Sequence, residues 1–164
     1  DPKANEFWQV DEGDEKLWAE SGMAGADLAS APAHSPKYHY SGAAMRRLLA
    51  ALPAGPDGAH TLRYTNPATG GAVMPALDCY AVRLPKGRTT RPKRTTCNMI
   101  CLVVSGSGRS TVGEHSFDWS QHDVFSIPHW TFASHTAIDG DASLFIVSDR
   151  SAFERLDLLR EELQ

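Results

Sequence analysis

The chain has 164 residues and a mass of 17.9 kDa, which suits one domain with an appendage. Hydrophobic residues make up 41% and charged residues 22%, which excludes a disordered chain, and no stretch approaches the ~18 apolar residues of a membrane span. The formal net charge of −4 argues against general nucleic-acid binding.

The cysteines indicate an expected compartment, and the first residue suggests how the chain is produced. The chain has three cysteines: Cys79, Cys97 and Cys101. Because this number is small and odd, a disulfide framework is not expected, and we expect a reducing, cytoplasmic location. We expect Cys97 and Cys101 to be small buried side chains, with a metal-thiolate or redox pair as the alternative. Because the chain begins with Asp1 and shows no signal segment, we expect a processed chain or part of a longer one.

Residues 1–75 are predicted to form an arm or linker. The first thirty residues hold eight acidic side chains against two basic ones, and residues 29–37 are small, polar and proline-bearing. One helix is predicted near residues 41–52, since Ser41 can cap it and Pro53 ends it. Its apolar residues recur at helical spacing: Met45, Leu48, Leu49 and Leu52.

Residues 76–164 are predicted to form an all-β barrel with a terminal helix. Short apolar runs alternate with Gly and Asp turns, a spacing typical of a sandwich or barrel. The expected strands lie at 77–84, 98–104, 109–112, 115–119, 123–128, 130–135 and 143–149. The run 98–104 is continuously apolar, which predicts a strand buried on both faces.

A helix is predicted after Ser151 at the end of the chain, packed outside the barrel. Ser151 and Glu154 have the spacing of a capping box. The apolar stripe of this helix would consist of Phe153, Leu156, Leu159 and Leu163.

The spacing of several residues resembles the two motifs of the cupin family, which is a jelly-roll β-barrel. The first motif runs from Gly through His-x-His and Glu to a second Gly, and Gly87, Met99 and Gly106 keep this spacing. The second motif is a Pro followed five residues later by a metal-binding His. Pro128 keeps that place, and Ala133 stands where the His would be.

Several segments of the sequence are similar to the C-terminal half of proteins of the gentisate 1,2-dioxygenase family. That family also contains salicylate and 1-hydroxy-2-naphthoate dioxygenases. The similar segments are HSPKYHY (34–40), RYTNPATGGAVMP (63–75), LPKG (84–87), VVSGSGR (103–109), FDWSQHDVFSIPHWT (117–131) and SDR (148–150). Members of this family are bicupins, with two barrels in one chain joined by a helical linker. The resemblance implies an N-terminal catalytic cupin with Fe(II) as partner, and assembly into homo-oligomers.

The positions that hold iron in a cupin oxygenase carry other residues in this chain. Lys93 and Thr95 stand at the two His positions, Met99 at the Glu position and Ala133 at the late His position. An ammonium, a hydroxyl, a thioether and a methyl group do not form a ferrous site. We therefore expect no catalytic residue, metal or cofactor in this chain, and a dry, apolar interior around Met99, Ile127 and Ala133.

Two other clusters leave alternatives open. A displaced metal site would use His122, His129 and His135, although surface or hydrogen-bonded histidines are the simpler interpretation. Residues 83–94 carry six basic side chains and no acid. This basic run could attract an anionic aromatic acid through Arg91, Lys93 and Arg94, dock against the acidic first thirty residues, or be a solvated loop.

Three function hypotheses follow. The first is the non-catalytic scaffold half of an Fe(II)-dependent dioxygenase that cleaves a gentisate-like hydroxylated aromatic acid with O₂. The second is a stand-alone cupin enzyme with a displaced His site. The third is a metal-free cupin module that binds a small organic acid. None of the three involves nucleic acid or a membrane, and the identity of the aromatic acid is not predicted.

Overall fold

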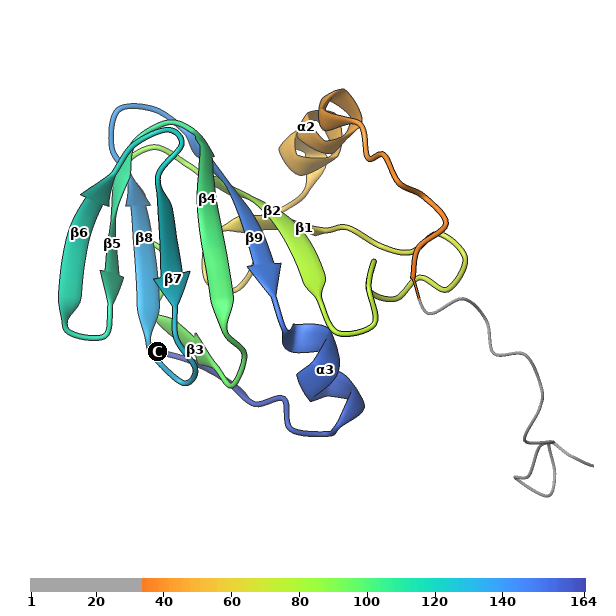
Figure 1. The fold of residues 1–164 in the computed structure, drawn as a ribbon. Helices are drawn as coiled ribbons and strands as arrows, with labels where there is room; N and C mark the ends of the chain where they lie inside the picture. The colour runs from red at the N-terminus through yellow and green to blue at the C-terminus, as the bar shows by residue number, and fades with distance from the viewer. Residues whose placement is uncertain (1–33) are drawn as a thin grey trace, which may run out of the picture. The chain divides into compact units, whose positions relative to one another are not determined.

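The computed structural model describes residues 34–164, which form two five-stranded antiparallel sheets packed face to face (Figure 1). The first sheet has the order β1 (His60–Arg63), β2 (Asp78–Leu84), β9 (Ala142–Ser148), β4 (Met99–Ser105) and β7 (Val124–Ile127). The second has the order β10 (Glu161–Leu163), β3 (Lys93–Thr95), β8 (Ala133–Ala137), β5 (Gly108–Val112) and β6 (His115–Trp119). This is the predicted jelly-roll architecture, built as two facing sheets.

The core lies between the two sheets, and alternation along the strands builds it. Every second residue of β9 is buried, and β5 follows the same pattern. The first sheet contributes Val82, Leu84, Cys101, Val103, Ile127, Leu144 and Ile146, and the second contributes Val112, Trp119, Ala133 and Ala137. Because the register of each strand sets which side chains face inward, the same pairing positions the residues that line the barrel interior.

The predicted helix is confirmed as α2 (Gly42–Ala51). The Ser41 side chain accepts a hydrogen bond from the Ala44 amide, and the chain turns extended at Leu52. Of the predicted apolar stripe, only Leu49 is buried, while Leu48 is 56% exposed. The predictions for the acidic first thirty residues lie outside the described part of the chain.

The structure adds one strand that the sequence did not suggest upstream of residue 76. Residues 60–63 form β1, which pairs with β2 from His60↔Arg83 to Arg63↔Tyr80. A four-residue strand of mixed polarity gives little periodic signal, and long-range pairing with β2 stabilises it. The division of the chain into a linker and a barrel at residue 75 stays a prediction.

A helix is confirmed near Ser151, but its predicted length and its predicted cap are wrong. The helix α3 (Arg150–Arg155) has six residues and is capped at Asp149 without a side-chain hydrogen bond, so the capping box does not form. Ser151 instead donates to the Pro75 carbonyl, and Asp157 adopts a left-handed φ of 55° that ends the helix. The chain then continues as β10, in which Leu163 pairs with Lys93.

The strand expected to be buried on both faces, β4, is buried on one. Cys101 and Val103 are fully buried, whereas Ile100 is 57% exposed and Leu102 and Val104 are also exposed. The outer face of β4 is therefore apolar, and no residue of the described chain covers it. We call Ile100, Leu102, Val104 and the neighbouring Val124 of β7 the outer apolar patch.

Neither α2 nor α3, the helices found within residues 34–164, has the length and apolar character that crossing a bilayer requires.

Candidate functional site

The four positions that correspond to cupin iron ligands come together around one cavity. Lys93 and Thr95 lie on β3, while Met99 begins β4 and Ala133 begins β8. Lys93 is paired directly with Ala133 across the β3–β8 ladder. All four side chains line a cavity of about 150 Å³ between the sheets.

The residues at these positions do not fit a ferrous ion. The Lys93 ammonium is 2.8 Å from the Glu161 carboxylate, and the Thr95 hydroxyl accepts a hydrogen bond from the Cys97 amide at 3.3 Å. Met99 and Ala133 contribute a thioether and a methyl group, which are not usual ligands for ferrous iron. Within residues 34–164, no group of three His, Cys, Asp or Glu side chains is arranged to hold a metal.

The structure does not bring the three candidate histidines of a displaced site together. His122 occupies an exposed turn with a φ of 78°, just before β7. The exposed His129 bonds through its ring to the Thr96 carbonyl oxygen and lies near the Phe153 ring. Of the three, His135 alone lines the cavity.

His135 is held inside the barrel by a chain of two hydrogen bonds. Its Nδ1 lies 2.7 Å from the Ser110 hydroxyl, which accepts a hydrogen bond from Trp119 Nε1 at 2.8 Å. Because Ser110 already accepts from Trp119, its own proton is free to be donated to His135. Burial lowers the pKa of His135 to about 4, although the Asp57 carboxylate opposes the shift. The imidazole is therefore neutral at physiological pH.

The stability of the fold should fall on mild acidification because of His135. The folded-state pKa of about 4 lies below the unfolded value of 6.5, so between these values the unfolded chain binds the extra proton. We expect the free energy of unfolding to drop by about 2 kcal/mol from pH 7 to pH 5. Urea denaturation at several pH values measures this drop.

The matched variant for this prediction is His135→Gln, whose amide can still accept from Ser110 but does not titrate. Its stability should change little between pH 7 and pH 5. A pH slope in His135→Gln equal to that of the wild type would show that another group carries the effect.

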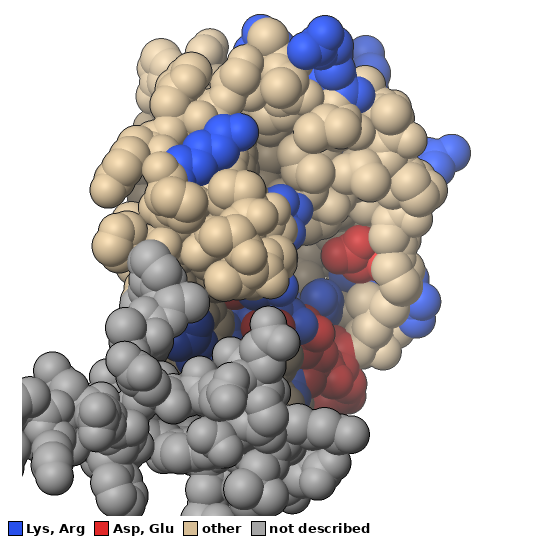
Figure 2. All heavy atoms as spheres, turned by 90° about the vertical axis from the view of Figure 1, so that its right-hand side faces the viewer, with Lys and Arg blue, Asp and Glu red and all other residues tan. Residues whose placement is uncertain are grey.

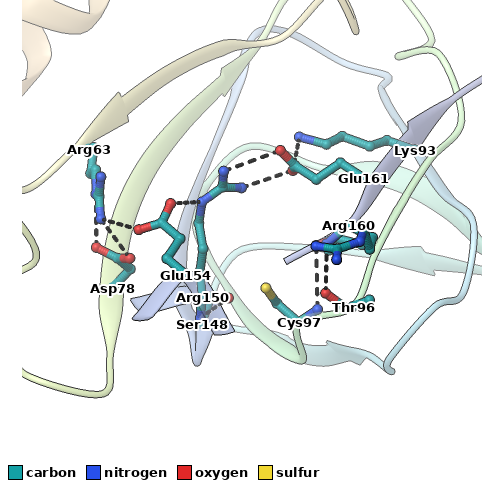
Figure 3. Close-up of polar contacts among 11 residues, drawn as sticks. Arg63, Asp78, Lys93, Thr96, Cys97, Ser148, Arg150, Glu154, Arg160 and Glu161 are labelled. Atoms are coloured by element: carbon teal, nitrogen blue, oxygen red, sulfur yellow. Dashed lines mark hydrogen bonds and ion pairs between the residues drawn. The ribbon is translucent and has the colours of Figure 1, made fainter. Parts of the chain in front are cut away.

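A continuous chain of ion pairs links the two sheets and ends at Lys93 (Figure 3). Asp78, whose side chain is fully buried, accepts two hydrogen bonds of 2.9 Å from Arg63. Further ion pairs run in the order Arg63–Glu154, Glu154–Arg150, Arg150–Glu161 and Glu161–Lys93. We call these six residues the ion chain. It connects β1 and β2 of one sheet through α3 to β10 and β3 of the other.

Arg150 and Glu161 form the centre of the ion chain. Arg150 donates from Nη1 and Nη2 to the two Glu161 carboxylate oxygens, at 2.8 and 3.2 Å, and from Nε to Glu154. Burial alone would raise the pKa of Glu161, but the hydrogen bonds from Arg150 and Lys93 lower it below its usual range. Burial alone would lower the pKa of Arg150, but the hydrogen bonds that Arg150 donates to Glu161 and Glu154 raise it above its usual value. Both groups stay charged at the cavity wall.

The anion-binding candidates already have partners on the C-terminal segment. Arg91 donates to the Gln164 main-chain oxygen at 2.7 Å, and Lys93 pairs with Glu161. Arg94 pairs with Glu162 and places its guanidinium 4.5 Å from the ring centres of both Trp130 and Phe132. The strand β10 therefore neutralises much of the basic run, which makes a free anion site there less favourable.

Figure 2 shows the same mixing of charge on the side of the molecule. Acidic side chains lie directly beside basic ones in the lower part of this face, whereas basic side chains alone are scattered over the upper part. Such interleaved charge fits internal ion pairing better than an electrostatic funnel for anions.

Sequence reasoning missed the residues that give the cavity its polar end. Arg150, Glu161 and Tyr80 line the cavity together with the predicted positions, so the interior is not uniformly apolar. Glu161 and Glu162 form an acidic pair close to the end of the chain, and their match to the basic run was the available signal. Assigning both to a helix hid that match, because only the β3–β10 pairing places Glu162 opposite Arg94 and Glu161 within ion-pair distance of Lys93.

The three cysteines, all within residues 34–164, are free thiols. Cys101 is fully buried in the core, where burial raises its pKa to about 12, and Cys97 is also buried and lines the cavity. Both have the character of the small buried side chains that we expected.

Comparison with curated proteins finds several dioxygenases. The 5-aminosalicylate 1,2-dioxygenase of Comamonas sp is 34% identical over 101 residues, which are 62% of this chain and 27% of that protein. Gentisate 1,2 dioxygenase 1 of Aquipseudomonas alcaligenes is 36% identical over 100 residues, 61% of this chain and 28% of that protein. The chain thus spans little more than a quarter of the length of these two relatives. No protein-family model matches the chain.

Solved structures agree with this result. Salicylate 1,2-dioxygenase from Pseudoaminobacter salicylatoxidans, in adducts with gentisate, superposes with a TM-score of 0.77 at 28% identity, over 92% of this chain and 43% of that one. A cupin 2 domain-containing protein from Halorhodospira halophila, at 17% identity and a TM-score of 0.50 over 59% of this chain and 68% of its own, shares the fold. By sequence the chain is similar to gentisate, 5-aminosalicylate and 1-hydroxy-2-naphthoate dioxygenases, and it shares the cupin fold of salicylate 1,2-dioxygenase.

Proposed function

We propose that this chain is the second, non-catalytic cupin half of an Fe(II)-dependent dioxygenase that cleaves gentisate-like hydroxylated aromatic acids with O₂. The observation that carries the proposal is the content of the four ligand positions. Lys93, Thr95, Met99 and Ala133 line one cavity, and they lack the imidazole and carboxylate groups that hold ferrous iron. The relatives are more than twice as long as this chain, which supports a separate catalytic barrel in the whole protein.

In this proposal the chain acts as a scaffold. An N-terminal cupin would hold Fe(II) and the aromatic acid, and this half would pack against it and support assembly of a homo-oligomer. The outer apolar patch favours such packing, because exposed apolar side chains on adjacent strands mark interaction surfaces. Partly buried ion pairs at the cavity suit a structural role for the barrel.

We also propose that the chain is located in the cytoplasm. We propose that it binds neither nucleic acids nor membranes. Free thiols at Cys79, Cys97 and Cys101 suit a reducing compartment. The net charge of −4 disfavours binding to phosphate backbones.

The isolated chain should not cleave gentisate. With Fe(II) added anaerobically and gentisate then supplied in air, we expect O₂ uptake to equal that of Fe(II) without protein, because no protein ligands hold an open-coordinate iron. An oxygen electrode measures this uptake. A longer protein that carries an N-terminal cupin with His-x-His ahead of this chain should be active under the same conditions.

The control is that longer protein with both histidines of its first barrel replaced by Ala, which should lose activity. Stoichiometric, iron-dependent O₂ consumption by the isolated chain would refute the proposal and would require a metal site elsewhere in the chain.

A further inference from the structure

The cavity between the sheets has the size and lining of a small hydrophobic binding site. Its volume is about 150 Å³, and its apolar wall comes from both sheets: Val82, Met99, Ile127, Ala133, Leu144 and Ile146. An apolar cavity of about this volume is large enough for one benzene ring. Three members of the ion chain also line it: Lys93, Arg150 and Glu161.

One hydroxyl group in this lining has no partner. The Tyr80 hydroxyl is buried and makes no hydrogen bond to any residue of the described chain. Burial is also the main cause of the upward shift in the pKa of Tyr80, so the hydroxyl is protonated and can both donate and accept. A buried hydroxyl without a partner is costly and calls for a physical explanation.

Two of the three cations in the cavity lining are paired with a carboxylate. Lys93 and Arg150 share Glu161, whereas Arg91 donates to the main-chain oxygen of Gln164 and Asp57 accepts from the Ala59 amide. His135 is uncharged at neutral pH, because burial lowers its pKa to about 4. An incoming carboxylate would have to displace Glu161 from two cations, whereas a neutral molecule leaves these pairs intact.

We propose that this cavity binds a small, uncharged monocyclic aromatic compound of the phenol class. The ring would lie against Met99, Ile127 and Ile146, and its hydroxyl would bond to the Tyr80 hydroxyl. This inference goes beyond the proposed scaffold function and does not depend on it, since it concerns this barrel alone.

Ligand-observed NMR titrations of the 164-residue chain with phenol, toluene and benzoate test the proposal. We expect saturable binding of phenol, weaker binding of toluene by about fivefold, and binding of benzoate at least about tenfold weaker than phenol. The difference between phenol and toluene reports the hydrogen bond, and the difference between phenol and benzoate reports charge.

Two variants and a control locate the site. Tyr80→Phe should weaken phenol by about fivefold and leave toluene unchanged, without loss of stability, because the lost hydroxyl has no partner in the free chain. Ala133→Leu should fill the cavity and weaken both compounds by at least about tenfold. Ser134 lies on the same strand, but its side chain is on the opposite face of the sheet, so Ser134→Leu should leave the binding of both compounds unchanged.

Three results would overturn the proposal: no saturation by phenol up to about 10 mM, tighter binding of benzoate than of phenol, or unchanged phenol binding in Tyr80→Phe. The Tyr80→Phe comparison decides the question even if Ala133→Leu does not fold. None of these results bears on the O₂-uptake assay, so the two proposals fail independently.

Discussion

Replacing Arg63 with Met is expected to lower the free energy of unfolding by about 3 kcal/mol, because it leaves the buried Asp78 carboxylate without its partner. The Asp78 side chain is 0% exposed, so water cannot take over the two lost hydrogen bonds. Urea denaturation followed by circular dichroism measures the change.

A second substitution separates the cost of an orphaned charge from the loss of packing. Arg63→Met combined with Asp78→Val should recover at least half of the lost stability, since a β-branched apolar residue suits the buried strand position. Arg109→Ala is the matched surface control. It breaks a similarly short pair with Asp118, but both side chains are about 60% exposed, so we expect a much smaller loss of stability than in Arg63→Met. Equal losses for Arg63→Met and Arg109→Ala would contradict the role given to burial.

Gly108→Ala is expected to destabilise the barrel by about 3 kcal/mol or more. A Cβ atom at Gly108 would collide with both the Thr136 carbonyl oxygen and the Trp119 ring. The oxygen belongs to the backbone of β8 and the ring is packed in the core, so moving either one would disrupt the β5–β8 ladder or the core packing. Thermal unfolding followed by Trp fluorescence measures the loss.

Gly140→Ala is the control for this substitution. Gly140 has no atom within 4 Å of the added Cβ and does not need a positive φ, so its stability should stay within about 0.5 kcal/mol of the wild type. If Gly108→Ala were equally neutral, the close approach of β5, β6 and β8 would not be a real constraint on the fold.

The ion chain shows most directly why parts of this molecule escape sequence reasoning. Arg63 and Glu154 are 91 positions apart, and no local pattern connects them. Their contact exists because β2 pairs with β9, which places the start of α3 beside β1. Charge complementarity between the basic run and Glu161–Glu162 was visible, but pairing them required knowing that the last residues form a strand.

Several features followed from the sequence by itself. Alternation and turn residues located most strands, because the period of two reflects which side chains face the core. The cupin spacing and the similar segments identified the fold and the relatives that the chain resembles. Spacing succeeds there because each motif is short and lies within strands that follow one another in the sequence.

Only the tertiary structure decided the rest. Leu156, Leu159 and Leu163 keep helical spacing, yet the chain leaves the helix at Asp157 because Glu161 and Glu162 gain ion pairs as a strand beside β3. Likewise, the apolar residues of β4 predicted burial on both faces, but no described element covers Ile100. Local periodicity reports which side chains can be buried, whereas long-range pairing determines which of them are, and against which partner.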